Sequence, residues 1–133
     1  MDLWKYYDGD LKYPNILNHF HEKEIAKTKS DWTFEYVSNY GEDKELEPII
    51  AKNAEYSFWY ALDILEGPFN LGEPAIAKDA EYSYMYARKN LKGPFPLGEP
   101  TIAKDNHYAK KYTNNVLKKD FILDGKLIYK YEG

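Results

Sequence analysis

Apolar residues in the middle of the chain recur at intervals of three and four, which is the spacing of one face of an α-helix. Within residues 74–92 this stripe consists of Ile76, Ala80, Tyr84, Ala87 and Leu91. Tyr82 and Tyr86 fall roughly opposite the stripe when each residue advances about 100°. A helix with bulky groups on two sides is usually sandwiched between neighbours. The pattern therefore predicts a helical segment packed between other elements.

Local signals around this stripe mark where the helices begin and end. Pro74 suits a first helical turn, because its φ is preset and it loses no hydrogen bond there. Asp79 suits the N-cap of a second helix over residues 80–92. That helix is expected to stop at Gly93, with the following proline barring continuation. The signals predict one short and one longer helix; a single unbroken helix is the alternative.

The same segment occurs three times at a period of 26 residues. Residues 47–57 match residues 73–83 without a gap, and a third copy begins at Glu99 and diverges after Asp105. A worn copy over residues 25–36 matches only with a deletion. A period in this range is typical of stacked supersecondary units, none of which buries its apolar face alone.

These features predict a mainly α-helical fold, a short α-solenoid of 26-residue two-helix repeats. The chain is expected to form a single domain over residues 1–133. Its parts would be a non-repeated or degenerate N-terminal segment, three repeats and a C-terminal tail or hairpin, over residues 1–46, 47–72, 73–98, 99–124 and 120–133.

Asp-Gly pairs between short apolar runs predict a small β-hairpin at each end of the chain. One pair is residues 8–9 and the other is residues 124–125. For the C-terminal pair, the alternative is that residues 121–123 continue the linker of the repeat, matching residues 95–97. A further helix is expected after Pro14.

Comparison of the three copies separates positions that repeat from positions that change. The repeated positions, which are expected to hold the stack together, are those of Pro48, Ile50, Ala51, Lys52, Tyr56, Tyr60, Leu65, Phe69 and Leu71. The variable positions form a wedge on the longer helices, with apolar residues that a purely solvated face would not favour. The candidate partner-binding residues are therefore Trp59, Leu62, Asp63, Met85, Arg88 and Lys89. Packing of this wedge against the N-terminal segment is the alternative.

The third copy is polar where the first two copies are apolar. Lys110 stands at the position of Phe58, and Thr113 at the position of Ala61. This substitution pattern is expected of a terminal capping repeat, whose outer side meets water.

Composition and charge narrow the classes of function. Without cysteine the chain has no disulfide framework and no thiolate metal site. A net charge of −4 gives no strong signal for nucleic-acid binding by phosphate neutralisation. No apolar run reaches the length of a membrane span, and the first residues lack the apolar stretch of a signal peptide. A cytoplasmic location is the expectation.

Few residues offer catalytic or metal-binding chemistry. His19 and His21 form the only metal-like cluster. On a helix they point about 200° apart and cannot share a metal ion, whereas on a strand they could; the local pattern favours a helix. No carboxylate pair lies in an apolar frame that would separate the two pKa values. The sequence therefore predicts no enzyme, no catalytic or metal residue and no cofactor.

The repeated unit resembles a known kind of viral repeat. Its pattern is Glu-Pro-x-Ile-Ala-Lys-Asp, then Tyr-Ser-Tyr-x-Tyr-Ala, then Leu-Lys-Gly-Pro-Phe-Pro-Leu-Gly. It resembles tandem repeats of uncharacterised proteins encoded by large tailed bacteriophages and some giant viruses. The resemblance covers residues 47–104 well and residues 105–123 partly. Those repeats often have proline after the aspartate, whereas Ala54, Ala80 and Asn106 stand there in this chain.

The resemblance implies a viral origin and transfers no catalytic residue. Taken with the repeat, it favours a non-enzymatic interaction module that inhibits or redirects a host protein in the host cytoplasm, for example an anti-CRISPR or other anti-defence inhibitor. One alternative is a self-assembling structural protein. The other is a small-ligand binder or enzyme that uses a groove lined by some of the 14 tyrosines.

Overall fold

The computed structural model describes the backbone of residues 16–133 and the side chains of residues 21–133. This part of the chain is mainly helical and ends in a small two-stranded antiparallel sheet. The helix expected after Pro14 is confirmed as α1 (Ile16–Ala26), and α2 (Ser30–Tyr40) follows it. The hairpin expected around residues 8–9 lies outside the described residues.

Three segments then repeat one order of elements at the 26-residue period. Each contains a short helix and a longer helix, which begins as α-helix and ends as π-helix. The short helices are α3 (Glu47–Ile50), α5 (Glu73–Ile76) and α7 (Glu99–Ala103). The longer helices are α4 (Ala54–Trp59) with η2 (Tyr60–Leu65), α6 (Ala80–Met85) with η4 (Tyr86–Leu91), and α8 (Asn106–Tyr112) with η6 (Thr113–Leu117). The 3-10 turns η3 (Asn70–Gly72) and η5 (Pro96–Gly98) precede α5 and α7.

The break between the short and the longer helix occurs at Asp79, which confirms the two-helix prediction. Asp79 has an extended backbone (φ −121°, ψ 124°), and its Oδ1 accepts the N–H of Tyr82 at 2.9 Å. Asn53 and Asp105 cap α4 and α8 in the same way. Because the backbone is extended at each cap, one unbroken helix is excluded.

The longer helix of the second copy stops before Gly93, as predicted, with Leu91 as its last helical residue. The left-handed residue is Lys92 (φ 55°) and not Gly93, whose N–H closes the helix on the Ala87 carbonyl at 3.1 Å. Glu66 and Lys118 adopt the same conformation in the other two copies.

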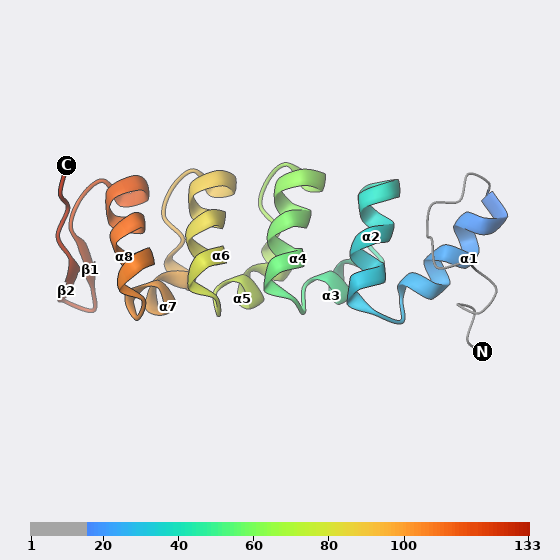
Figure 1. Cartoon of the computed structure of the whole chain (residues 1–133), viewed down its shortest axis with the longest axis horizontal. Coiled ribbons are helices and arrows are strands. Elements are labelled where there is room, and N and C mark those ends of the chain that lie inside the picture. The colour runs from blue at the N-terminus through green and yellow to red at the C-terminus, as the bar shows by residue number, and fades with distance from the viewer. Residues whose placement is uncertain (1–15) are drawn as a thin grey trace.

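Helix α2 and the three longer helices lie side by side in a row along the long axis of the molecule (Figure 1). The row is α2, α4, α6 and α8, with the short helices joining each longer helix to the next. The helices α4 and α6, and likewise α6 and α8, are in direct contact. Ile50, Ile76 and Ile102 of the short helices are fully buried in the same apolar cluster. Each such side chain contributes about 1.5–3 kcal/mol by leaving water, so the row is held by a continuous apolar core.

One tyrosine in each copy is completely buried and makes two hydrogen bonds. The Tyr86 hydroxyl donates to Glu73 Oε2 at 2.6 Å and accepts the backbone N–H of Phe69 at 2.9 Å. Tyr60 and Tyr112 do the same at the same sequence separations. Burial and the neighbouring carboxylate raise the pKa of each of these hydroxyls. We call Tyr60, Tyr86 and Tyr112 the interior tyrosines.

The C-terminal hairpin is confirmed as β1 (Phe121–Leu123) and β2 (Lys126–Tyr129). Asp124 and Gly125 both have positive φ at its turn, as a two-residue hairpin loop requires. Phe121 is also buried against Tyr112, at 5.2 Å between ring centroids, as Phe95 is against Tyr86 at 5.0 Å. The linker interpretation and the hairpin interpretation therefore both hold for this segment.

Two expectations about exposure are wrong. Thr113 was expected to face water, but it is fully buried, and its hydroxyl donates to the Ala109 carbonyl at 2.7 Å. Its hydroxyl is satisfied inside its own helix, so burial costs little. Leu71 and Leu97 were expected to hold the stack, but they are about half exposed (53% and 54%). Lys110 is exposed as expected.

One side-chain hydrogen bond occurs both in the segment predicted to be a worn copy and in the first clear copy. The Ser57 hydroxyl donates to the Ile50 carbonyl, seven residues earlier, at 3.1 Å. The Thr33 hydroxyl donates to the Ala26 carbonyl at the same separation. The α1–α2 segment therefore contains the same type of hydrogen bond as the repeated segment.

Candidate functional site

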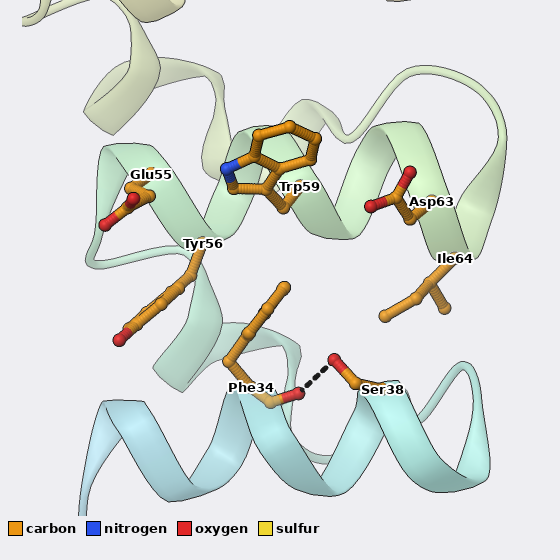
Figure 2. Close-up of a pocket in the computed structure, with 7 residues that line it drawn as sticks. All are labelled: Phe34, Ser38, Glu55, Tyr56, Trp59, Asp63 and Ile64. Atoms are coloured by element: carbon orange, nitrogen blue, oxygen red, sulfur yellow. Dashed lines mark hydrogen bonds between the residues drawn. The ribbon is translucent and has the colours of Figure 1, made fainter.

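A groove lies between α2 and the first longer helix, with a cavity volume of about 510 Å³. Figure 2 shows Phe34 extending from α2 toward α4, and Ile64 extending from η2 toward α2. The lining residues are Phe34, Ser38, Glu55, Tyr56, Trp59, Asp63 and Ile64. The groove thus combines three aromatic rings with two carboxylates.

The aromatic wall is fixed by contacts across the two helices. The rings of Phe34 and Tyr56 are stacked, with centroids 4.8 Å apart and planes inclined by 12°. The Tyr56 hydroxyl donates to Asp31 Oδ1 at the start of α2. This hydrogen bond, with desolvation, raises the pKa of Tyr56 to about 12. The tyrosine is therefore neutral and held in place at physiological pH.

A small residue on α2 stands where later helices carry large ones. Phe34, Phe58 and Tyr84 each meet a tyrosine of the next longer helix. Four residues after them come Ser38, Leu62 and Arg88, respectively. Ser38 projects little beyond the helix, because its hydroxyl donates to the Phe34 carbonyl at 2.8 Å. The serine side chain is therefore smaller than those of Leu62 and Arg88 at the equivalent positions of the later helices.

The charges of the groove lining are all negative. Glu55 Oε2 accepts the Tyr82 hydroxyl at 3.2 Å, and both Glu55 and Asp63 are exposed. No lysine or arginine is among the seven lining residues. The lining therefore presents carboxylates beside aromatic faces.

The six residues proposed from the sequence divide among three settings. Trp59 and Asp63 line the groove. Leu62 and Met85 are partly buried and pack against the core. Arg88 donates to the Tyr84 hydroxyl at 2.9 Å, and Lys89 is exposed.

The other five lining residues were not among the six candidate residues proposed from the sequence. They are Phe34, Ser38, Glu55, Tyr56 and Ile64. The available signal was the worn copy, because it aligns Phe34 with Phe58 and so places α2 beside α4. Tyr56 was interpreted only as a stacking residue, since it is repeated in every copy.

The densest acidic run, residues 42–47, is a separate feature engaged in ion pairs. Glu45 lies 2.9 Å from both Lys23 and Lys27 of α1. Hydrogen bonds from Lys23 and Lys27 lower the pKa of Glu45 to about 2. The run therefore ties α1 to the loop before α3.

The described residues contain no group of three or more histidine, cysteine, aspartate or glutamate side chains placed to hold a metal ion. His19 lies in α1, but its side chain is outside the described set. Within residues 16–133, no helix combines the length and the apolar character that crossing a membrane requires.

Comparisons with protein-family models, with curated proteins and with solved structures find no match to the chain. The groove and the repeat are therefore the features of the molecule that bear on its function.

Proposed function

We propose that the chain is a short α-solenoid that binds another protein, with the groove between α2 and α4 as the anchoring point. The observation that carries this proposal is the groove itself, which opens three aromatic side chains to the outside. Aromatic residues in a concave site are typical anchors of protein interfaces, because they bury a large area at small entropic cost.

The recurring hydrogen bonds support the solenoid part of the proposal. Tyr82 and Tyr108 each donate to a glutamate 27 residues earlier, on the preceding longer helix. The same contact between successive units is what a stack with nearest-neighbour interfaces requires. Such a stack presents its longer helices as one extended face, on which the groove lies.

A photo-crosslinking experiment tests the binding function. A benzoylphenylalanine at position 63, on the groove, is compared with one at the equivalent position 89, outside it. In a lysate of the cell in which the protein is made, position 63 is expected to capture one protein. An excess of unlabelled wild-type chain should abolish that capture. No competed product at position 63, or equal products at both positions, would contradict the proposal.

A Ser38→Leu variant sharpens the test. It places at the groove the side chain that Leu62 supplies at the next junction, so the fold should be retained while the space is filled. The folded variant is expected to fail as a competitor, and its circular dichroism should match the wild type. A Ser38→Leu chain that competes as well as wild type would show that the groove is not the anchor.

Self-assembly is a second candidate, favoured by the C-terminal hairpin. Ile122 and Leu127 are exposed (58% and 57%), and a two-stranded sheet has open edges that can pair with another chain. Light scattering that finds only monomers at tens of micromolar would rule it out.

The inhibitory role in a host cell and the viral origin rest on the resemblance of the repeat alone. They are part of the proposal only as the biological setting in which such a binder would act. The identity of the crosslinked protein would decide between a host protein and a protein of the same virus.

A further inference from the structure

The three junctions between successive helices of the row α2, α4, α6 and α8 can be compared position by position. Each brings an aromatic ring of one helix against a tyrosine of the next. The pairs are Phe34 with Tyr56, Phe58 with Tyr82, and Tyr84 with Tyr108, at centroid distances of 4.8, 5.6 and 6.0 Å. The same kind of aromatic pair therefore occurs at all three junctions, and the residues around the pair differ from one junction to the next.

At the last junction a lysine ammonium group of the chain itself lies over the aromatic pair. Lys111 Nζ lies 6.0 Å from the centroid of the Tyr84 ring and 5.9 Å from that of Tyr108. These distances are at the limit for attraction between an ammonium group and the faces of aromatic rings. The structure therefore shows a positive charge placed over this type of aromatic pair.

At the first junction the charges are reversed. Trp59 stands at the position of Lys111, so a third ring replaces the cation. Glu55 and Asp63 stand at the positions of His107 and Asn115. The groove therefore has more aromatic surface, two carboxylates and open volume, with no lysine or arginine among its lining residues.

From this comparison we propose that the groove binds the guanidinium group of an arginine side chain on the partner protein. This inference rests on the proposed protein-binding function and specifies its chemistry. The planar guanidinium stacks on the ring of Trp59 or Phe34, while Asp63 accepts its N–H groups. Arginine fits better than lysine, because its flat and weakly hydrated group matches ring faces and carboxylates together.

The two carboxylates have acceptor capacity for such a ligand. Glu55 uses Oε2 to accept the Tyr82 hydroxyl at 3.2 Å, and an ionised carboxylate has about four lone-pair positions. Asp63 is exposed at the groove. The acidic run at residues 42–47 is a poorer competitor for the same ligand, because Glu45 is already paired with Lys23 and Lys27.

The test uses the whole chain and two short peptides that differ only in charge. Acetyl-Gly-Arg-Gly-amide is titrated against acetyl-Gly-citrulline-Gly-amide, in which the neutral citrulline keeps the shape of arginine. Binding is followed by the NMR signal of the Trp59 indole N–H, identified with a Trp59→Phe variant. The arginine peptide is expected to shift this signal saturably and to bind about tenfold more tightly than the citrulline peptide.

Matched variants locate the acceptor groups. Glu55→Gln and Glu81→Gln make the same change at equivalent positions, since each glutamate accepts the hydroxyl of a tyrosine 27 residues later. Only Glu55 lines the groove, so only Glu55→Gln should weaken binding of the arginine peptide, by about threefold. Asp63→Lys, which puts the charge of Lys89 at the first junction, should abolish it.

Three results would overturn the inference. They are equal binding of the arginine and citrulline peptides, no shift of the Trp59 signal by either peptide, and equal weakening by Glu55→Gln and Glu81→Gln. None of these results would change the outcome of the crosslinking experiment at position 63, which tests protein binding itself. The failure of the arginine assignment is therefore distinguishable from the failure of the binding function.

Discussion

The chain places tyrosines in two parallel rows that differ in burial. The interior tyrosines (Tyr60, Tyr86, Tyr112) are completely buried, and all three hold the same kinds of partner: a glutamate and a backbone N–H. We call Tyr56, Tyr82 and Tyr108 the surface tyrosines; they are partly exposed and donate to Asp31, Glu55 and Glu81, respectively.

The difference between the rows follows from access to water. A buried hydroxyl without partners loses the hydrogen bonds that water would give, which costs about 1–3 kcal/mol. A surface hydroxyl can exchange its partner for water at little cost. The partners of the interior tyrosines are therefore nearly the same in every copy. The surface tyrosines can differ between copies in the acid that accepts their hydrogen bond and in their neighbouring side chains, and one of them lines the groove.

The largest effect is expected at alkaline pH, where both rows act together. Their pKa values are raised in the folded chain, to about 12 for Tyr56 and Tyr82 from an ordinary value of 10.0. Above pH 10 the unfolded chain therefore binds fewer protons than the folded chain, so the free energy of unfolding falls as pH rises. The stabilisation is present below pH 10 and is lost through about pH 12.

Urea denaturation followed by circular dichroism checks this prediction. The midpoint should be nearly constant between pH 8 and pH 9 and should fall steeply from pH 10 upward. A midpoint that stays constant to pH 11 would show that the hydroxyls are not held as described.

Removing one hydroxyl from each row should separate them directly. Tyr86→Phe leaves the Phe69 N–H and the Glu73 carboxylate without their partner, and should lower the free energy of unfolding by about 2–3 kcal/mol. Tyr82→Phe removes an exposed hydrogen bond and should cost about 0.5 kcal/mol. Urea denaturation measures both changes. An equal decrease in the free energy of unfolding for the two variants would contradict the difference between the rows.

Two glycines likewise differ in the space around them. A Cβ on Gly98 would lie 2.6 Å from the Ser83 hydroxyl oxygen, whereas a Cβ on Gly93 would meet nothing closer than 3.9 Å. Gly98→Ala is therefore expected to destabilise the chain by about 1–2 kcal/mol through overpacking. Gly93→Ala should change its stability by about 0.5 kcal/mol or less. Thermal unfolding of both variants measures the difference, and similar melting temperatures would contradict it.

The smallest effect concerns the end of the longer helix. Lys92 occupies the left-handed region (φ 55°), which costs a residue with a Cβ about 1–2 kcal/mol, and glycine adopts it freely. Since glycine also loses more entropy on folding, Lys92→Gly should stabilise the chain by about 0.5–1 kcal/mol. A lower melting temperature for Lys92→Gly would show that the lysine makes a compensating contact.

Much of the fold could be read from the sequence because its signals act over a few residues. Asp79 caps the helix that starts beside it, and Asp124 with Gly125 turns the chain on itself. The candidate site was only partly accessible in this way. Trp59 and Asp63 were proposed from their variability, but Ser38 gives no local sign that it lines a cavity.

The sequence by itself determined the 26-residue period, the helix starts and the C-terminal hairpin, because caps, prolines and turn residues act locally. Only the tertiary structure decided which tyrosines are interior and where the groove opens. Tyr86 meets Phe69 from 17 residues away, and Phe34 meets Tyr56 across two helices. Burial and cavities arise from side chains that the fold brings together from distant parts of the chain. The sequence of a single segment therefore does not determine them.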